Sequence, residues 1–298
     1  MLKKSWQKYV GEVFSVLPRD GNVESTVWIV RKELEQRFGK YITIPGVHVC
    51  LDGPTGTGKT SLAKTILKRK NINYKRVQIT KNMTWGEFCF NIIGRKNYSS
   101  STRSVKVDIG IQKGLPTILF QIASGKSKSN IDDEILREKI SKTITESKLC
   151  EVMAEENESL FIDDFEKASS DLVTRIADMC KLLTDSYVAS NAKLIIAGTD
   201  DIYARLTNAS TALEERLREI SIGTFSSKNE SWHFLYLGFE KLKIENPVTY
   251  YNKKYINKTK LFECVQKVYD AANGLPKSLN SLGIDICMNA SYDRQRVV

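Results

Sequence analysis

Histidine is the scarcest residue in this chain of 298 residues, which contains only His48 and His233. With two histidines, neither a zinc site nor a histidine-based catalytic triad is expected. The six cysteines include no C-x-x-C pair, so they predict reduced and mostly buried side chains. No apolar run approaches the roughly 18 residues that a membrane span needs, and the basic segment 1–9 lacks the apolar core of a signal peptide. We therefore expect a cytoplasmic protein with no membrane partner.

Charged and hydrophobic residues are not scarce, and their shares of 27% and 41% are typical of a globular protein. The length allows one large domain or two smaller ones. Residues 62–128 contain 14 Lys+Arg and 2 Asp+Glu, whereas the remainder contains 31 and 33, so this segment accounts for the net charge of +10. Such a basic segment indicates a polyanionic partner, most commonly nucleic acid. A solvated, lysine-rich surface is the alternative interpretation.

Residues 53–60, with the sequence GPTGTGKT, fit the phosphate-binding P-loop pattern G-x-x-x-x-G-K-[ST]. The apolar segment 47–51 before them predicts a buried strand, and the segment 61–68 predicts a helix. Glycines let the backbone curve around an anion, and the helix N-terminus adds partial positive charge. Lys59 is expected to reach the β- and γ-phosphates of ATP, and the Thr60 hydroxyl is expected to hold Mg²⁺. The residues expected to bind the nucleotide are Gly53, Pro54, Thr55, Gly56, Thr57, Gly58, Lys59, Thr60 and Ser61.

Two acidic residues, Asp163 and Asp164, follow the apolar segment 159–162. An apolar strand that ends in acidic residues is the Walker B pattern, the second signal of a nucleotide site. Asp163 is expected to hold Mg²⁺, and Asp164 is expected to activate the attacking water. Because many strands end in aspartate, the P-loop upstream gives this pattern most of its weight.

Another apolar strand is predicted at residues 192–199, and Thr199 is the polar residue at its carboxyl end. Ligands of open parallel sheets bind at the carboxyl ends of the strands. Thr199 is therefore placed to sense the γ-phosphate or the attacking water. The alternative is that Thr199 caps a helix, beside Asp200 and Asp201.

The rest of the chain predicts a lead-in, an insertion and a helical tail. Residues 1–45 form the lead-in, with an amphipathic helix at 26–38 that Gly39 ends. Residues 95–130 include an alternating apolar and polar segment, which predicts a basic β-hairpin insertion. The predicted elements before the tail are a strand at 76–79, a helix at 84–93, a helix from 131 to about 156, a helix at about 170–183 and a short strand at 221–223. In the helix at 84–93, Thr84 is the expected N-cap and Glu87 stands three residues on, as in a capping box. The tail helices are predicted at 230–243, at 261–272 and from 273–279 onward.

Four signals in order resemble the AAA+ ATPases over roughly residues 45–290: the P-loop, Asp163–Asp164, Thr199 and the segment Gly274–Lys277 with the sequence GLPK. The segments 195–200 and 215–218 resemble the Orc/Cdc6-like group in particular, with the TniB/TnsC transposition ATPases nearby. The resemblance implies an α/β fold, namely a P-loop NTPase αβα sandwich with a parallel sheet followed by a small α-helical lid. The expected limits are 46–225 for the nucleotide-binding domain and 226–298 for the lid.

The resemblance also implies roles for single residues. Thr199 becomes the first sensor, and Lys277 becomes the second sensor cation, which folds from the lid onto the γ-phosphate. Arg216 becomes an arginine finger offered to the nucleotide of a neighbouring subunit, with Arg218 as the second choice, so a homo-oligomer is expected. Without the resemblance, both arginines fit an exposed helix with i,i+4 charge pairs.

Three departures from the family pattern affect these roles. Asp164 stands where a catalytic glutamate is usual and is one methylene shorter, which suits slow hydrolysis or a nucleotide-gated switch. Lys277 stands where arginine is more common and lacks its bidentate geometry. No winged-helix DNA reader is visible after the lid, and the basic insertion at 95–130 is a candidate replacement.

Two functions fit these observations. The first is an ATP-hydrolysing AAA+ protein that oligomerises, assembles on nucleic acid and activates a partner enzyme, with a mobile-element or antiviral defence role. The second is a STAND-like nucleotide-gated switch that acts on a protein partner with slow or no hydrolysis. Binding to DNA that weakens steeply with salt distinguishes the first from the second. A metabolic kinase is not favoured, because the sequence has no acceptor-site motif.

Overall fold

The computed structural model describes residues 2–15, 27, 29–93, 144–199, 201–242 and 258–292. The predicted hairpin insertion at 95–130 and the first part of the helix predicted from 131 lie outside these residues. Contacts divide the chain into two compact units. The first comprises Met1–Arg37, Gly53–Lys70 and Ser221–Val298, and the second comprises Phe38–Asp52 and Asn71–Ile220.

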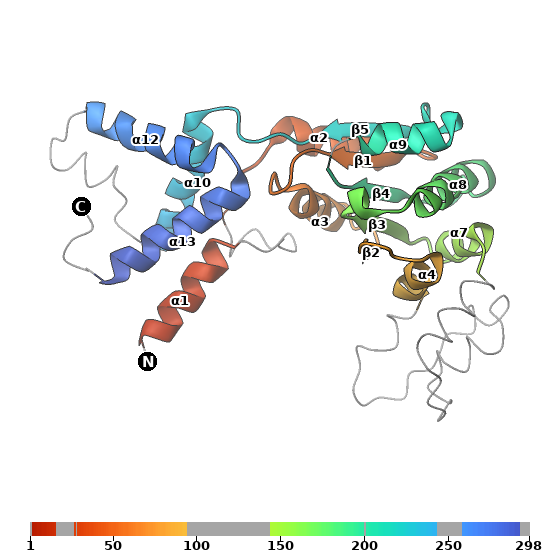
Figure 1. The fold of residues 1–298 in the computed structure, drawn as a ribbon, viewed down its shortest axis with the longest axis horizontal. Coiled ribbons are helices and arrows are strands. Elements are labelled where there is room, and N and C mark those ends of the chain that lie inside the picture. Colours follow the sequence, from red (N-terminus) through yellow and green to blue (C-terminus); the bar gives the residue numbers. More distant parts are fainter. Residues whose placement is uncertain are drawn as a thin grey trace, which may run out of the picture. The chain divides into compact units, whose positions relative to one another are not determined.

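The second unit is built on a five-stranded sheet with the order β2-β3-β4-β1-β5 (Figure 1). The residue pairing shows that β2 lies parallel to β3, β3 to β4, and β4 to β1. The predicted α/β fold with a parallel sheet is thus confirmed, and the carboxyl ends of these strands meet at one edge. The strands are β1 (His48–Asp52), β2 (Tyr74–Gln78), β3 (Ser159–Asp163), β4 (Leu194–Ala197) and β5 (Leu217–Ser221).

The helices of the second unit pack on one another and on the strands: α8 contacts α7 and α9, and α4 contacts β2. Side-chain caps at Thr84, Thr145 and Ser169 fix where three of them begin. Ser169 accepts the N–H of Leu172 at the start of α8. Thr84 and Glu87 form the predicted capping box of α4, with bonds of 3.0 and 3.2 Å. These elements are α4 (Trp85–Ile93), α7 (Glu146–Glu155), α8 (Ser170–Ser186) and α9 (Ile202–Ala209), with the 3₁₀ turns η3 (Phe165–Lys167) and η4 (Thr211–Leu213).

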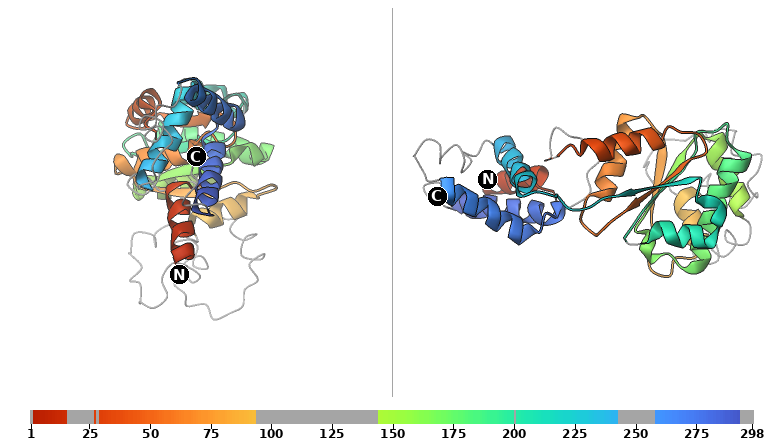
Figure 2. Two further views of the ribbon diagram at one scale, coloured as in Figure 1. Left: turned by 90° about the vertical axis from the view of Figure 1, so that its left-hand side faces the viewer. Right: turned by 90° about the horizontal axis from the view of Figure 1, so that it is seen from above.

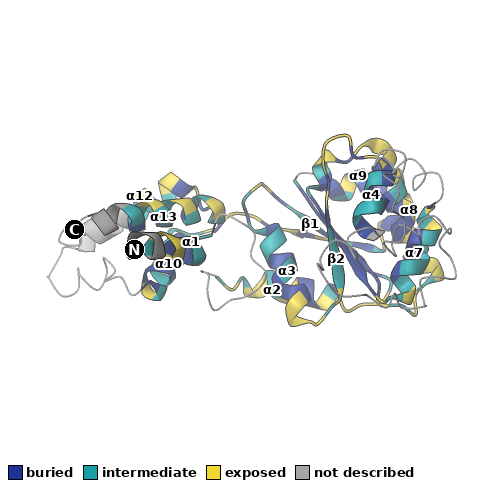
Figure 3. Cartoon of the chain, turned by 90° about the horizontal axis from the view of Figure 1, so that it is seen from below, coloured by how far each residue is buried: buried dark blue, intermediate teal, exposed yellow. Residues whose placement is uncertain are grey.

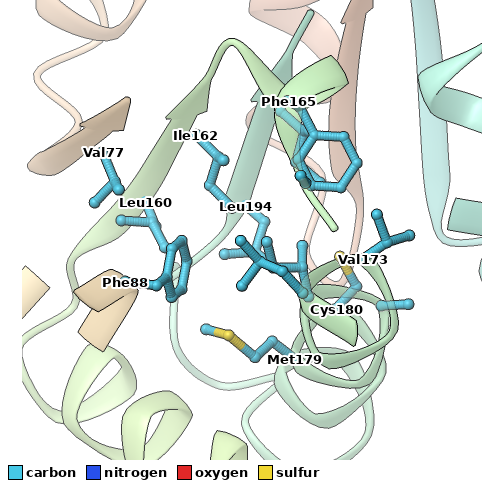
Figure 4. Packing of buried hydrophobic residues seen from close by; sticks show 14 of the residues in the cluster. Val77, Phe88, Leu160, Ile162, Phe165, Val173, Met179, Cys180 and Leu194 are labelled. Carbon is cyan, nitrogen blue, oxygen red and sulfur yellow. The ribbon is translucent and has the colours of Figure 1, made fainter. Parts of the chain in front are cut away.

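The core of the second unit joins β3 and β4 to α8. β3, with the apolar residues 160–162 at its centre, and β4, which is apolar throughout, are both buried along their whole length. Figure 3 colours the chain by burial. Leu160 and Ile162 of β3 belong to the same cluster as Met179 and Cys180 of α8 (Figure 4). Phe165, just after β3, is also fully buried in this cluster. The close packing on both sides of Asp163 therefore fixes where the acidic end of β3 lies.

The first unit contains helices from both ends of the chain. α10, α12 and α13 contact one another, and α1 contacts α13 (Figure 2). Phe14, just after α1, is fully buried. A Cβ atom on Gly238 of α10 would lie 2.0 Å from its ring, and one on Gly283 of α13 would lie 2.5 Å away, so both glycines make room for Phe14. The helices are α1 (Leu2–Val13), α3 (Lys59–Arg69), α10 (Lys228–Lys241), α12 (Lys258–Ala272) and α13 (Pro276–Tyr292).

The helix predicted at 26–38 has different limits in the structure. It is α2 (Lys32–Tyr41), and residues 29–31 precede it. Gly39 does not end the helix, because Phe38 and Ile42 are both buried and lie four residues apart. Packing of these two side chains outweighs the weak helix propensity of glycine.

The strand predicted at 221–223 also differs, because β5 comprises Leu217–Ser221. The two adjacent charged residues Arg218 and Glu219 interrupt the alternation of apolar and polar residues that would predict a strand. Leu217 and Ile220, on either side of them, are buried. Pairing with β1 therefore decided the structure of this segment. Among the described residues, none of the helices is apolar over the length that a bilayer crossing requires.

Candidate functional site

The loop between β1 and α3 is built on three glycines with positive φ. The φ angles of Gly53, Gly56 and Gly58 are 143°, 89° and 96°, in the region that favours glycine. A Cβ atom on Gly53 would lie only 2.2 Å from the backbone oxygen of Ile222. Backbone atoms cannot move aside as a flexible side chain can. Any side chain at position 53 is therefore incompatible with this loop.

The start of α3 places hydrogen-bond donors and a cation at this loop. The N–H of Leu62 donates to the oxygen of Gly58 at 2.9 Å, so the earlier N–H groups of the first turn have no intrahelical acceptor. Such groups, together with the helix dipole, favour an anion. Lys59 Nζ donates to the oxygens of Gly53 at 2.5 Å and Pro54 at 2.9 Å. The ammonium group thus lies on the loop itself.

The remaining P-loop residues differ in exposure. The Thr57 hydroxyl donates to Pro54 O at 2.9 Å and closes the tip of the loop. Pro54 and Thr55 are exposed at the tip, whereas Thr60 and Ser61 are half-buried in the first turn of α3. Thr60, for which the sequence predicts a Mg²⁺ ligand, therefore lies in the first turn of α3 directly after Lys59.

The start of α13 lies against the P-loop. The N–H of Lys277 donates to Gly56 O at 3.2 Å, and a Cβ atom on Gly56 would lie 3.0 Å from Cβ of Lys277. Gly274 has a φ of 66°, and a Cβ atom there would lie 2.6 Å from Phe225 O. The first unit thus brings the predicted second sensor, Lys277, to the predicted phosphate loop.

Arg31 is a residue of this region that the sequence pattern missed. Its Nη1 donates to Gly223 O at 2.8 Å, and its guanidinium carbon lies 4.7 Å from the ring centroid of Phe225. Burial lowers the pKa of Arg31, against the attraction of Glu230. Its Nη2 is buried and has no hydrogen-bond partner within the described residues. Such a donor normally has an acceptor, so Arg31 is a candidate ligand contact.

Asp163 and Asp164 are held by different partners at the end of β3. Asp163, with 3% of its surface exposed, accepts two hydrogen bonds from Arg76 on β2, at 3.1 and 2.6 Å. Asp164 has a φ of 58° and accepts from Gln78 at 2.9 Å and Lys167 at 2.7 Å. Burial raises the pKa of Asp164, but the bonds from Lys167 and Gln78 lower it by more. Asp164 is therefore a carboxylate at neutral pH.

Glu166 links the end of β3 to the end of β4, and the sequence did not indicate it. Its Oε2 accepts the N–H of Thr199 at 3.2 Å. Arg205 of α9 holds the segment after β3, because its guanidinium donates to the oxygens of Phe165, Glu166 and Ala168 at 3.3, 3.2 and 2.7 Å. Thr199, the predicted first sensor, thus has its backbone fixed against the segment that follows Asp163 and Asp164.

Arg216 lies at the amino end of β1, the end opposite to the carboxyl ends of the strands. Its backbone oxygen accepts the N–H of His48, the first residue of β1, whereas the P-loop follows Asp52, the last. A five-residue strand separates these points by about 15 Å. Its guanidinium pairs with Asp185 at the end of α8, at 2.8 and 3.2 Å. Arg218, the second choice, donates to the backbone oxygens of Glu214 and Leu217, at 3.4 and 3.1 Å.

His48 has a structural place beside Arg216. Its Nδ1 accepts the N–H of Leu194 at 3.0 Å, and its Nε2 lies 2.8 Å from the oxygen of Cys180. Burial lowers the pKa of His48 to about 4. The imidazole is therefore neutral and joins β1, β4 and α8.

Each unit thus collects part of the predicted site. The P-loop, Arg31 and Lys277 lie together in the first unit. In the second, the carboxyl ends of β3 and β4 bring together Asp163, Asp164 and Thr199. A parallel sheet whose first strand leads into a P-loop, with acids at the end of β3, defines a P-loop nucleotide-binding protein of the α/β class.

The sequence matches the model of a family described as the AAA domain over residues 46–206, more than half of the chain. The chain therefore belongs to the AAA domain family, and the predicted resemblance to AAA+ ATPases is confirmed. A comparison with curated proteins found no match.

Solved structures share the fold at low sequence identity. A Walker-type ATPase of Pyrococcus abyssi is 16% identical, with a TM-score of 0.56 over 94% of this chain and 73% of that one. The ORC2 protein of Aeropyrum pernix, determined in ADPNP and ADP complexes, is 12% identical, with a TM-score of 0.52 over 90% of this chain and 64% of that one. The chain therefore spans less than two thirds of ORC2, and at these identities the likeness concerns the fold.

Proposed function

We propose that the protein binds ATP with Mg²⁺ at residues 53–61 and hydrolyses it. The observation that carries this proposal is the loop of positive-φ glycines, closed by Lys59 and contacted by the start of α13. Lys59 and Lys277 would supply positive charge to the phosphates, and the buried donor of Arg31 would face another part of the nucleotide. The family and the ADPNP and ADP complexes of ORC2 support a nucleotide ligand.

The acidic residues suit the metal that accompanies ATP. Carboxylate and hydroxyl oxygens are the ligands that Mg²⁺ prefers, and Mg²⁺ is usually held by one or two carboxylates together with phosphates. No cluster of three His, Cys, Asp or Glu in the described part of the chain is suited to a metal, so nucleotide phosphates would complete the coordination. Asp163 and Thr60 would be the protein ligands, and Mg²⁺ would neutralise phosphate charge. Asp164 would orient water, and Thr199 would sense the γ-phosphate.

The proposal extends to assembly. Arg216 lies beside the amino end of β1, so its guanidinium suits the nucleotide of a second copy rather than the loop that follows the carboxyl end of its own β1. A finger in trans would make hydrolysis depend on a homo-oligomer. The basic segment 62–128 supports nucleic acid as the scaffold of that assembly, on which the protein would activate a partner enzyme.

A second candidate function, a nucleotide-gated switch on a protein partner, is favoured by one observation. Both acids of the proposed hydrolytic site already accept hydrogen bonds from charged or amide side chains, namely those of Arg76, Gln78 and Lys167. A site held in this way suits nucleotide binding with slow turnover.

The variant Lys59→Ala tests the proposed nucleotide site. Removing the ammonium group deletes charge-assisted bonds to phosphate, so the affinity for ATP is expected to fall by about a hundredfold. Equilibrium titration with a fluorescent ATP analogue and Mg²⁺ measures the loss. Lys70→Ala is the matched control, because Lys70 is exposed at the other end of α3. Equal affinity in the two variants would remove residues 53–61 from the proposal.

A further inference from the structure

Strand β2 supplies side chains to both acids at the end of β3. Arg76 and Gln78 are two residues apart, so they lie on the same face of β2, and Gln78 pairs in register with Asp163. Arg76 reaches Oδ2 of Asp163 through Nε and Nη2, at 3.1 and 2.6 Å. The proposed metal ligand therefore already has a cationic partner from the edge strand of the sheet.

Asp163 and Arg76 differ in exposure. Because of this difference, Asp163 depends more on the ion pair than Arg76 does. The side chain of Asp163 is 4% exposed and that of Arg76 is 31% exposed. A buried carboxylate without a partner is costly, whereas the partly exposed guanidinium of Arg76 can be solvated. Releasing Arg76 is therefore costly chiefly on the side of Asp163, unless another cation replaces it.

Both carboxylate oxygens of Asp163 accept hydrogen bonds within the described residues. Oδ2 takes both bonds from Arg76, and Oδ1 accepts the N–H of Asp164 at 3.2 Å. A divalent cation that approaches Asp163 meets occupied acceptors and a like charge, and like charges repel strongly away from bulk water. Arg76 and a metal ion are thus alternative partners of one carboxylate.

We propose that Arg76 competes with Mg²⁺ for Asp163, so that binding of the metal–nucleotide complex requires Arg76 to leave this carboxylate. The proposal rests on the function proposed above and adds a regulation to its metal site. Arg76 raises the Mg²⁺ concentration at which the site fills, and binding of the metal releases the Arg76 side chain from Asp163.

Three variants of β2 test the competition. Arg76→Gln removes the cation, Arg76→Lys keeps the charge but loses the bidentate fork, and Lys75→Gln is the matched control. Lys75 also loses an ion pair on substitution, but its partners are Glu158 at 2.8 Å and Glu156 at 3.8 Å rather than Asp163. Binding of a fluorescent ATP analogue is measured in excess EDTA and then over a Mg²⁺ titration.

The Arg76 variants are expected to change the Mg²⁺ concentration at half-maximal binding of the ATP analogue, here called the midpoint. Binding of the analogue in EDTA is expected to stay the same. Because a charge-assisted bond no longer opposes the metal, the midpoint of Arg76→Gln is expected to fall by about tenfold or more. Arg76→Lys is expected to lie between Arg76→Gln and the unmodified protein, and Lys75→Gln to match the unmodified protein. Unchanged or higher midpoints in both Arg76 variants would overturn the proposal. If Arg76→Gln does not fold, Arg76→Lys alone decides by the same criterion.

A titration with Mn²⁺, followed by electron paramagnetic resonance without nucleotide, separates this proposal from the proposed function. Tighter Mn²⁺ binding by the Arg76 variants than by the unmodified protein and Lys75→Gln supports the competition, even if no protein binds the ATP analogue. Equal Mn²⁺ binding together with equal Mg²⁺ midpoints rejects the competition while leaving nucleotide binding intact.

Discussion

Two arginine–aspartate pairs lie at opposite edges of the same sheet, and they differ in burial. At the carboxyl end of β3, the side chain of Asp163 is 4% exposed and that of Arg76 is 31% exposed. Arg216, just before β5, has a side chain that is 27% exposed, and that of its partner Asp185 in α8 is 42% exposed. Their geometry differs as well, because Arg76 donates two hydrogen bonds to Oδ2 of Asp163, at 3.1 and 2.6 Å. Arg216 donates one hydrogen bond to Oδ2 of Asp185 at 3.2 Å, and its Nη2 lies 2.8 Å from Oδ1.

Burial of the aspartate decides what each pair does. Separating a charged pair is costly when a buried partner is left behind, whereas an exposed pair contributes about 0–1 kcal/mol. Arg76 is thus held until another cation takes its place. The exposed pair of Arg216 and Asp185 is expected to be weak, as the proposed transfer of Arg216 to a phosphate requires. The first pair suits a lock on the metal site, and the second suits a residue that acts on a neighbour.

Arg216→Ala is expected to give the largest effect. If Arg216 is a trans finger, its loss should lower ATP turnover of the assembled protein by about a thousandfold and leave ATP binding unchanged. The reason is that its charge would stabilise the transition state and not the bound nucleotide. The measurement is turnover per subunit against protein concentration.

A mixing experiment completes this test. Lys59→Ala subunits retain Arg216, so adding them to Arg216→Ala subunits should restore turnover at intermediate ratios. If no ratio restores turnover, Arg216 does not act in trans. The Arg76–Asp163 pair would then be the only one of the two with a role at the nucleotide.

The second expected effect is on stability, and it tests the contrast in burial. Arg76→Ala leaves a buried carboxylate without its cation and should lower the free energy of unfolding by about 2 kcal/mol, a value reduced for the partial exposure of Arg76. Arg216→Ala should change it by less than about 1 kcal/mol. Urea unfolding without nucleotide or metal measures both. Equal losses would show that the two pairs do not differ as their burial indicates.

The contiguous motifs are the part of the candidate site that local sequence indicates. Residues 53–61 and the two acids at the end of β3 are defined by local sequence, because a glycine loop and a strand end are local structures. The strands β1, β3 and β4 were also predictable, since each is a short apolar run. In contrast, β5 was placed wrongly, because its charges concealed two buried residues.

The partners of the motif residues could not be predicted. Arg76 is 87 residues from Asp163, Arg31 is 192 residues from Gly223, and Asp185 is 31 residues from Arg216. Each contact depends on strand order and helix packing, which no local pattern encodes. Sequence therefore proposes candidate groups for the chemistry, whereas only the fold shows which side chains hold those groups in place.

The smallest expected effect belongs to Asp185→Asn, and it sharpens the comparison most. Removing the exposed carboxylate releases Arg216 without altering it, so the protein concentration for half-maximal turnover should fall by up to about fivefold, the equivalent of an exposed pair. Asp171→Asn is the matched control, because Asp171 pairs with Arg175 at 3.0 Å on the same helix. An unchanged concentration would mean that Asp185 does not restrain Arg216. A higher concentration would mean that Asp185 orients Arg216 for its neighbour, so that this exposed pair is part of the assembled site.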